Sequence, residues 1–505
     1  MILRTHQAEM QTACTDVLEG ALIKQIIASV TPGGGKSKLP VILASLLIPQ
    51  VADRIMWVVP RNPLKYQGEG EFTDPNFPTH IRMRATDGNE RDPDRGTNGY
   101  ITTYQAIGQT PEPHAAYCRK YRTILFLDEP HHIGEASSWE TALRPMIDAA
   151  VLVVYASGTL ARGDGQKIAF LGYAGEHVAL FNTSSTRVIQ YSRKQAIIDG
   201  SILPVYGKTI DGAAEWISAE GIHRQVDSIR RSGSDRSEAL YTALRTEYAY
   251  QLLSACINDW ENERKIYPDG KLLVVAPNIE YAENYHRFLA RHYLSEIATS
   301  EDSTSAHKAI EGYKRGLFPV LVTVAMAYEG LSVPSISHIA CLTQIRSVPW
   351  LEQCFARANR CAPGKTHGTI YGPADQMFLR AMQMIEEEQK PGLKDEDKKR
   401  VKSAIPIELV ESVSAPKIEP LWSSVLGEQV ELKPRDFTES EKERVLIENI
   451  RAIRADVLSR KRAGGIKSAE NLFNLRIRQV ADKKLEEMST EELTKVWMIL
   501  REKYA

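Results

Sequence analysis

The sequence predicts an α/β protein in which two parallel-sheet units follow each other and a small helical region comes last. Three observations support this fold class. Short apolar runs of strand length recur, stretches of helical character separate them, and past Asp375 the chain becomes charged and then helical. Runs that are apolar on both faces are typical of strands buried in a parallel sheet.

The two sheets are predicted from two series of apolar runs, each bounded by turn residues. The first series comprises Gln25 to Val30, Ile55 to Val59, Gly99 to Thr103, Ile124 to Leu127 and Val151 to Ala156. The second comprises Lys271 to Ala276, Val320 to Val324, His338 to Leu342 and Gly368 to Tyr371. Between them, residues of about 205–265 are strongly charged, and we expect a helical connector and the first helix of the second unit there.

Four segments follow from this pattern. We expect a first domain over residues 1–205, a second over 206–385, a linker or strap over 386–437 and a helical domain over 438–505. The charge run with its Pro-Gly break after Glu386 marks the linker, and Gly464-Gly465 is expected to separate two helices.

Composition and charge indicate a soluble globular protein. Net charge is -1 and 43% of residues are hydrophobic, which disfavours a histone-like nucleic-acid coat but allows a local basic groove. The 6 cysteines are scattered without metal-binding spacing, as expected for reduced thiols. The first residues do not resemble a signal peptide, and the apolar runs are too short to cross a membrane. We therefore expect an intracellular, cytoplasmic protein.

A glycine-rich loop directly after the first strand carries the sharpest motif. It reads Thr31-Pro32-Gly33-Gly34-Gly35-Lys36-Ser37 and precedes a predicted helix. Glycines let backbone amides approach a phosphate closely, Lys36 is expected to reach the β- and γ-phosphates, and the Ser37 hydroxyl is expected to bind Mg²⁺. The alternative is a flexible glycine-rich turn, which the flanking strand and the Lys-Ser pair disfavour.

A strand that ends in two carboxylates supplies the second motif. Asp128, Glu129 and His131 follow the apolar run from Ile124 to Leu127. Asp128 is expected to hold Mg²⁺ through water, while Glu129 is placed to orient and deprotonate an attacking water. His131 is assigned to coupling. A helix cap would explain an Asp-Glu pair on its own, but not one that follows a phosphate loop at this distance.

With these motifs the chain resembles a superfamily 2 helicase of the DExH type over about residues 3–380. The resemblance implies two RecA-like motor domains that bind ATP with Mg²⁺. It assigns adenine recognition to Gln7 and nucleic-acid contact to the segments Val58 to Leu64 and Ile101 to Tyr104. It assigns the coupling of hydrolysis to movement to Ser157, Gly158 and Thr159, where the family usually has Ser-Ala-Thr.

The resemblance continues in the second half of the chain. Val274 to Asn278 matches the motif that opens the second motor domain. Glu329 and Gly330 match residues that contact nucleotide and backbone phosphates, although Ser332 replaces the usual aspartate of that motif. Gln353, Arg357 and Arg360 match a motif whose glutamine couples and whose arginines reach the γ-phosphate across the domain cleft. Two arginines three residues apart are expected on one face of a helix.

Nucleic-acid contacts are predicted at strand ends, where open α/β sheets bind their ligands. The candidates are Arg61, Thr103, Asn278 and Thr323, and each has a turn or a helix cap as its alternative. The region after Thr438 is more basic than the remainder of the chain. A module that binds duplex or branched nucleic acid, a docking domain for a protein partner and a solvated helical bundle all stay open there.

The function predicted from the resemblance is an ATP-dependent DNA helicase or translocase that remodels forks, branched DNA or repair intermediates, like phage-encoded and repair-type members. An RNA helicase is one alternative. A motor subunit that pumps duplex DNA for a nuclease partner is another, and no nuclease motif occurs in this chain. A non-catalytic scaffold is disfavoured because Lys36, both carboxylates and both arginines are intact. DNA is favoured over RNA, with a protein partner for the helical region and no membrane partner.

Overall fold

The computed structural model describes residues 3–90, 92–160, 162, 166–175, 177–299, 303–324, 331–393, 416–427, 446–447, 450–451, 454 and 466–504. The chain forms two compact units. The first comprises residues 1–206, 345–361 and 379–413, and the second comprises residues 207–344, 362–378 and 414–505. Since a segment near Arg357 joins the first unit from far along the chain, the predicted domain boundaries stay a prediction.

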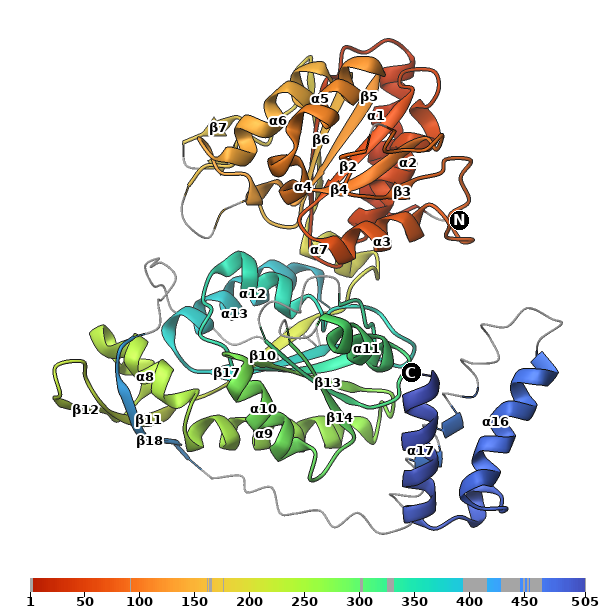
Figure 1. Ribbon diagram of the computed structural model, residues 1–505. Helices are drawn as coiled ribbons and strands as arrows, with labels where there is room; N and C mark the ends of the chain where they lie inside the picture. Colours follow the sequence, from red (N-terminus) through yellow and green to blue (C-terminus); the bar gives the residue numbers. More distant parts are fainter. Residues whose placement is uncertain are drawn as a thin grey trace. The chain divides into compact units, whose positions relative to one another are not determined.

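The first unit is built on a seven-stranded sheet whose paired strands all run parallel (Figure 1). In sheet order the strands are β3 (Arg84–Ala85), β4 (Gly99–Thr103), β2 (Arg54–Val59), β5 (Thr123–Asp128), β6 (Leu152–Ser157), β1 (Gln25–Val30) and β9 (Thr186–Tyr191). Strands β4, β5 and β6 are buried along their whole length, which explains why they are apolar on both faces.

Helices cover both faces of this sheet, and each face has its own core. Helices α1 (Thr5–Leu18) and α2 (Leu39–Leu47) pack on the side chains of Ile26, Ala28 and Trp57. Helices α4 (Tyr104–Gln109), α5 (Pro111–Lys120) and α6 (Ser138–Ala149) pack on Ile27, Met56 and Val58 from the other side. Successive residues of one strand therefore enter opposite cores, as the two-residue period of a strand requires.

The second unit contains a six-stranded sheet. In sheet order its strands are β10 (Val205–Ile210), β17 (Gly368–Pro373), β16 (Ile336–Cys341), β13 (Lys271–Ala276), β15 (Val320–Val324) and β14 (Ser295–Ala298). The pairings from β17 to β14 are parallel. Its helices include α9 (Glu247–Arg264), α10 (Ile279–Leu289) and α11 (Ser303–Lys314). The prediction of an α/β protein with two tandem parallel sheets is confirmed.

The expectation of a helical connector over residues of about 205–265 is wrong in its first half. That part forms β10 and two strands of a small antiparallel sheet, β11 (Gly212–Ile217) and β12 (His223–Val226). In β11 the side chains of Ala214 and Trp216 are buried against α8 (Arg236–Ala243), while the residues between and after them are only partly buried. This alternation has the two-residue period of a strand, which explains why a helix does not form here.

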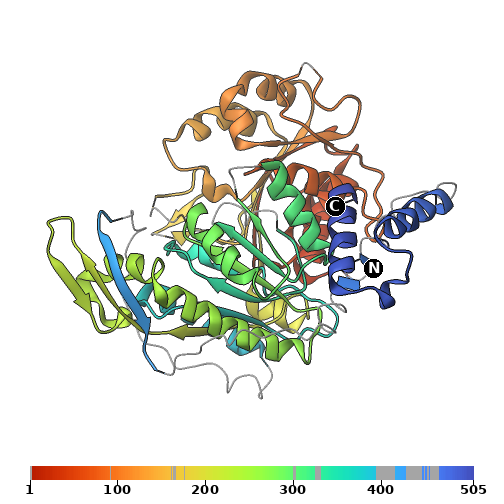
Figure 2. The same cartoon turned by 60° about the horizontal axis from the view of Figure 1, so that its bottom comes forward.

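The third strand of this small sheet comes from the predicted linker. Strand β18 (Glu419–Val425) pairs antiparallel with β11, more than 200 residues earlier in the chain. Figures 1 and 2 both show β18 lying beside β11. The segment is therefore a structural part of the second unit and not only a tether.

Two helices lie near the C-terminus, α16 (Ile466–Val480) and α17 (Thr490–Tyr504), and they contact each other. The predicted break at Gly464-Gly465 lies outside the described residues. Among the helices that could be examined, none combines the length and the apolar character needed to cross a membrane. The cysteines are free thiols, five of them buried and Cys361 exposed.

Candidate active site

The candidate site lies where three neighbouring strands of the first unit end. In the sheet β5 lies beside β6, and β6 lies beside β1. Because these strands are parallel, their carboxyl ends meet at one edge of the sheet. Thr31 follows β1, Asp128 is the last residue of β5, and Ser157 is the last residue of β6. Residues from three separate sequence motifs thus gather at one place.

The phosphate loop has a backbone that only glycine adopts without strain. Gly33 and Gly35 have φ values of 86° and 94°. Gly34 leaves no room for a side chain, because a Cβ there would lie 2.8 Å from the carbonyl oxygen of Thr31. The loop then passes through a short 3₁₀ turn at Lys36–Lys38 into α2. A glycine cradle that opens a helix is the arrangement that phosphate groups bind.

Residues at the beginning of α1 form hydrogen bonds to the phosphate loop. The guanidinium Nη1 of Arg4 donates to the carbonyl oxygen of Gly34 at 2.6 Å, and Nε2 of Gln7 donates to that of Gly35 at 3.3 Å. Oε1 of Gln7 accepts from the backbone N–H of Arg4 at 3.1 Å. The predicted adenine-reading residue is therefore next to the loop, with both ends of its amide bonded to the protein.

Lys36 forms ion pairs with both strand-end carboxylates. Its Nζ lies 2.7 Å from Oδ1 of Asp128 and also contacts Oε1 of Glu129. Burial disfavours a charged lysine, but the two carboxylates outweigh burial and raise the pKa of Lys36. Burial raises the pKa of Asp128, and the charge of Glu129 adds to this effect. For Glu129, Lys36 and His131 outweigh burial and hold the pKa well below its usual range.

Glu129 is held in place by the segment that follows β6. Its Oε2 accepts a hydrogen bond from the Ser157 hydroxyl at 2.6 Å and one from the Gly158 N–H at 3.4 Å. The backbone at Glu129 has a φ of 53°, an uncommon value for a residue with a side chain. The Ser157 hydroxyl oxygen in turn accepts from the backbone N–H of Thr159 at 3.1 Å. The predicted coupling segment thus touches the predicted base directly.

His131 lies on the same side of Glu129. Its Nδ1 is 3.3 Å from Oε2 of Glu129 and 3.2 Å from the Ser157 hydroxyl. His132, which the sequence gives no role of its own, is half-buried, and burial lowers its pKa to about 4. The two neighbouring histidines therefore have different surroundings, and among the contacts described His131 is the histidine that lies against the Glu129 carboxylate.

The arginine motif belongs to the first unit, and one expectation about it is wrong. Helix α12 (Val348–Phe355) ends before Arg357, so Arg357 and Arg360 lie in the turn after the helix and do not share a helix face. The backbone N–H groups of Arg357 and Ala358 bond to carbonyls three residues back, which closes the helix. Burial lowers the pKa of Arg360 to about 9, and the nearby charge of Arg357 adds to this effect. Gln353 is partly buried on α12.

Asn359, between the two arginines, contacts the phosphate loop. Its Nδ2 donates to the carbonyl oxygen of Pro32 at 2.9 Å, and its own carbonyl accepts from the N–H of Leu203 at 2.6 Å. A Cβ on Gly33 would lie 2.5 Å from Oδ1 of Asn359. The arginine motif and the phosphate loop are therefore joined through a side chain to which the sequence gave no role.

Pro32 also packs against the coupling segment. A Cβ on Gly158 would lie 2.8 Å from Cγ and 3.0 Å from Cδ of the Pro32 ring. Such contacts are too close for any alanine to be accommodated without movement. Because Gly158 has no Cβ, the Pro32 ring can pack directly against its backbone.

Comparisons with known proteins agree with this geometry. Residues 1–161 match the family model described as type III restriction enzyme, res subunit. The chain resembles an ATP-dependent type ISP restriction-modification enzyme bound to DNA, with 13% identity, a TM-score of 0.51, and coverage of 99% of this chain and 38% of that one. This likeness concerns the fold. The family match covers the part of the chain that holds the phosphate loop and the Asp128 and Glu129 pair. That part is similar to the res subunit of type III restriction enzymes.

Two sequence relatives extend the match beyond the first unit. An uncharacterized protein of Mycobacterium tuberculosis is 26% identical over 380 residues, which cover 73% of this chain and 61% of the relative. An uncharacterized protein of Mycobacterium leprae is also 26% identical over 380 residues, covering 72% and 61%. This chain therefore matches less than two thirds of the length of these relatives.

The resemblance to superfamily 2 helicases implies ATP with Mg²⁺, and the residues present fit both. The glycine cradle, in which a Cβ at any of three positions would meet other atoms, suits a polyphosphate. The hydroxyl of Ser37 and the carboxylate of Asp128 are oxygen ligands of the kind Mg²⁺ prefers. Lys36 supplies the compensating positive charge. These residues are the candidates for holding the nucleotide and its metal ion.

The residues predicted to contact nucleic acid form different contacts within the protein. Thr103 caps α4 by accepting from the N–H of Ala106, and Asn278 caps α10 by accepting from that of Tyr281. Thr323 is buried, and its hydroxyl donates to the carbonyl oxygen of Ala298 at 3.0 Å. Arg61 is half-buried before α3 (Asn62–Glu71). Glu329 and Gly330 lie outside the described residues.

The sequence analysis assigned no role in this candidate site to three residues that contact it. Arg4 and Asn359 bond to the loop, and the Tyr104 hydroxyl donates to the carbonyl oxygen of Asp128 at 2.8 Å. All three adjoin residues that the motifs singled out. Their position as polar or aromatic residues within or beside a motif was the signal from which a role in the site could have been predicted.

Proposed function

We propose that this protein is an ATP-driven motor that translocates along or remodels DNA. One observation carries the proposal. A phosphate loop lysine is paired with two strand-end carboxylates, and one of these is bonded to the Ser157 segment. This combination provides a hydrolytic site and a direct link from that site to a segment able to transmit movement.

The chain's own groups can bind and orient a nucleoside triphosphate. The backbone amides of the glycine-rich loop receive the β- and γ-phosphates, and the Lys36 ammonium exchanges its carboxylate partners for phosphate oxygens. Ser37 and Asp128 hold Mg²⁺, which when bound neutralises developing negative charge on the phosphates. Arg357 and Arg360 lie in a segment tied to the loop through Asn359, and they add positive charge near the γ-phosphate.

Glu129 is prepared to act on the attacking water. Its Oε2 is occupied by Ser157 and Gly158, whereas Oε1 contacts Lys36. When Lys36 turns to the phosphate, Oε1 becomes available to accept a hydrogen bond and then a proton from water. Because its pKa is held low, Glu129 is ionised at neutral pH and can orient that water.

The same contacts provide a coupling route. A change in the charge of Glu129 acts on Ser157 and Gly158, and Gly158 packs on Pro32, whose carbonyl binds Asn359. A change at the reacting phosphate can therefore alter the position of the arginine segment. The proposal includes domain boundaries at residues 205 and 385. It also includes an accessory role for residues 438–505, which would bind DNA or a protein partner.

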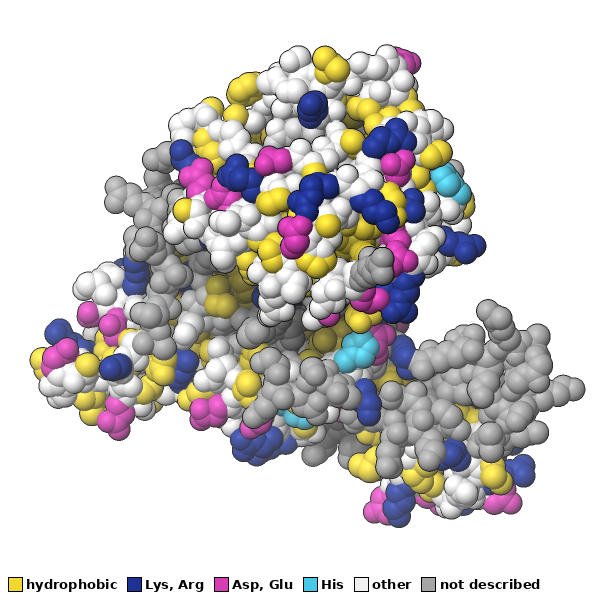
Figure 3. All heavy atoms as spheres, turned by 45° about the horizontal axis from the view of Figure 1, so that its top comes forward, with side chains coloured by type: hydrophobic (Ala, Val, Ile, Leu, Met, Phe, Trp, Pro, Cys, Tyr) yellow, Lys and Arg dark blue, Asp and Glu magenta, His cyan; other side chains and the backbone are white. Residues whose placement is uncertain are grey.

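DNA is proposed as the track because the restriction-modification enzyme with the same fold was solved bound to DNA. The family description, a restriction enzyme subunit, favours duplex translocation over strand separation as the second candidate. On the face drawn in Figure 3, the described basic and acidic side chains of the first unit, the uppermost part, are interspersed. Contacts with the backbone of a track would then come from local groups at strand ends.

The test is the rate of ATP hydrolysis without nucleic acid and with single-stranded, duplex, forked and four-way DNA, and single-stranded RNA. Lys36→Ala is the blank. We expect DNA to stimulate the wild-type chain at least tenfold and the blank not at all. Stimulation by duplex DNA without strand separation supports the restriction-type motor. Stimulation by RNA alone contradicts the choice of DNA, and equal activity of the blank contradicts the motor itself.

A further inference from the structure

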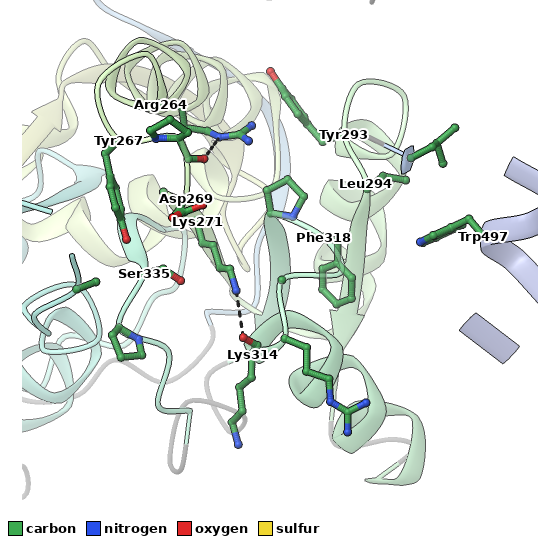
Figure 4. Close-up of a pocket in the computed structure, with 18 of the residues that line it drawn as sticks. Arg264, Tyr267, Asp269, Lys271, Tyr293, Leu294, Lys314, Phe318, Ser335 and Trp497 are labelled. Carbon is green, nitrogen blue, oxygen red and sulfur yellow. Dashed lines mark hydrogen bonds between the residues drawn. The ribbon is translucent and has the colours of Figure 1, made fainter. Parts of the chain in front are cut away.

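The second unit contains a cavity that the motor mechanism does not use. It has a volume of about 760 Å³ and lies at the amino ends of three strands of the sheet. Lys271 begins β13, Pro319 precedes β15 and Ser335 precedes β16, and all three line the cavity (Figure 4). The carboxyl ends of these strands are at the other edge of the sheet. A volume of this size is typical of pockets for small molecules.

The charge of the lining is strongly positive. Four basic side chains line it, Arg264, Lys271, Lys314 and Arg315, and Asp269 is the one acidic residue among the lining residues described. Arg264 and Lys271 approach from one side, and Lys314 and Arg315 come from the end of α11 (Figure 4). A pocket with this balance attracts an anion, because field lines from several cations converge in a concave, partly apolar space.

Lys271 places a buried cation at the floor of the cavity. Its side chain is only 8% exposed, and its Nζ donates to the carbonyl oxygens of Tyr313 and Lys314. Burial lowers the pKa of Lys271 to about 8, although Asp269 acts in the opposite direction. No carboxylate in the described part of the chain forms an ion pair with this ammonium. An anion in the cavity would offset the cost of burying its charge.

Aromatic rings form much of the remaining wall. Tyr267 and Phe318 are almost fully buried, and Tyr293 also lines the cavity. Trp497 projects from α17 towards Leu294 at the far side of the cavity (Figure 4). Aromatic walls of this kind stack on flat rings, and a stacked base contributes about 1–3 kcal/mol to binding.

We propose that this cavity binds a nucleotide, with its phosphate against Lys271, Lys314 and Arg315 and its base against Tyr267, Tyr293 and Trp497. The combination of clustered cations and aromatic rings suits a flat base joined to an anionic phosphate. The nucleotide is either free in solution or part of a nucleic-acid strand, since both present the same chemistry. This second site lies in a different unit from the phosphate loop and does not depend on hydrolysis there.

Photolabelling of the full chain tests the proposal. One arm uses 8-azidoadenosine monophosphate, and the other uses a short single-stranded oligodeoxynucleotide that carries 5-iodouracil. Labelled peptides are mapped by mass spectrometry. We expect label on peptides that contain Tyr267, Tyr293 or Trp497. The variants Lys314→Glu and Arg315→Glu should each lower that label at least tenfold, because each replaces attraction for phosphate with repulsion.

Lys308→Glu is the matched control, because Lys308 is an exposed lysine of the same helix that does not line the cavity. It should leave the label unchanged. Trp497→Ala, which alters no charge, should also lower the label if the ring stacks on the base. Label on first-unit peptides reports the phosphate loop separately, so failure here is distinguishable from failure of the motor proposal.

The two arms identify the source of the nucleotide. Label from the monophosphate that free AMP displaces indicates a small-molecule site, and label from the oligonucleotide alone indicates a strand-binding site. Either result supports nucleotide binding in the cavity. The proposal is overturned if neither probe labels these peptides in the folded chain, or if Lys314→Glu and Arg315→Glu label as strongly as Lys308→Glu.

Discussion

The carboxyl ends of the strands carry a network of charged side chains in the first sheet but not, among the contacts described, in the second. In the first unit, Asp128 and Ser157 end neighbouring strands, and Lys36 and Glu129 join them in one bonded network. In the second unit, the comparable positions near Asn278 and Thr323 bond only to nearby backbone in the contacts described. The parallel sheet provides the edge, and the residues placed there decide whether it is a reaction site.

The largest effect that tests this contrast is expected from Lys36→Ala. Removing the ammonium leaves Asp128 and Glu129 without their shared cation and removes a contact to the phosphates. We expect ATP hydrolysis to fall about a thousand-fold, the upper range for loss of one electrostatic stabiliser. Lys38→Ala is the control, since Lys38 pairs with Glu71 and Asp74 instead. Equal losses in both variants would contradict a special role for Lys36.

Two partly buried carboxylates, one in each unit, give a second contrast, because the pKa of Glu352 is raised and that of Asp259 is lowered. Burial raises the pKa of Glu352 from 4.5 to about 7, with Arg193 opposing and Glu388 adding to the shift. The folded chain holds this proton more tightly than the unfolded chain, so stability falls as pH rises from about 4.5 to about 7. A shift of this size corresponds to about 3 kcal/mol.

Asp259 in the second unit should behave in the opposite way. Hydrogen bonds from His338 and Lys208 outweigh burial and lower its pKa, so its stabilising effect is present above pH 3.8 and is lost in acid. The measurement is the free energy of unfolding between pH 5 and pH 8. We expect Glu352→Gln to gain stability at pH 8 and Asp259→Asn to lose it. A change of the same sign in both variants would refute the assignment.

The contact between Pro32 and Gly158 predicts a smaller loss of ATP hydrolysis in a Gly158 variant, and a second substitution at Pro32 should restore the rate. Gly158→Ala forces a Cβ against the proline ring, and we expect a cost of about 1–2 kcal/mol and a roughly tenfold loss of hydrolysis. Adding Pro32→Ala should restore most of the rate. Gly70→Ala is the control, because a Cβ there meets no atom within 4 Å. Purely additive losses in the double variant would show that the two residues are not coupled.

The smallest effects are expected at two helix caps. Thr103→Ala and Asn278→Ala each remove a side-chain cap, and each should lower the free energy of unfolding by about 1 kcal/mol. Only Thr103 precedes Tyr104, which bonds to Asp128, so only Thr103→Ala should also slow hydrolysis in the absence of DNA. Denaturant titration and the basal rate test this. An equal loss of hydrolysis rate in both variants would contradict the view that only the first sheet carries the reaction site.

Much of the fold could be predicted because buried parallel strands leave continuous apolar runs. The strands that carry Asp128 and Lys271 were placed within a residue or two for that reason. Strand β11 was missed because it is short and alternates buried with partly buried residues, and because its partner β18 lies far away in the sequence. Its stability depends on a long-range pairing that local pattern does not reveal.

The candidate site divides in the same way. Motifs identified Lys36, Asp128, Glu129 and Ser157 because their spacing after strands is local information. The roles of Asn359 and Gly158 depend on which side chains meet across the fold, since Asn359 bonds to Pro32 and Gly158 packs on its ring. The prediction that Arg357 and Arg360 share a helix face was wrong because α12 ends at Phe355 and backbone bonds to carbonyls three residues back form a turn there.

The most direct test of the account compares ATP binding with ATP hydrolysis in Glu129→Gln. The substitution keeps the shape of the side chain and removes the charge that orients and deprotonates water. We expect the variant to bind ATP at least as tightly as the wild-type chain while hydrolysis in the presence of DNA falls at least about a hundred-fold. Hydrolysis at the wild-type rate would contradict the central claim that this strand-end carboxylate drives the motor.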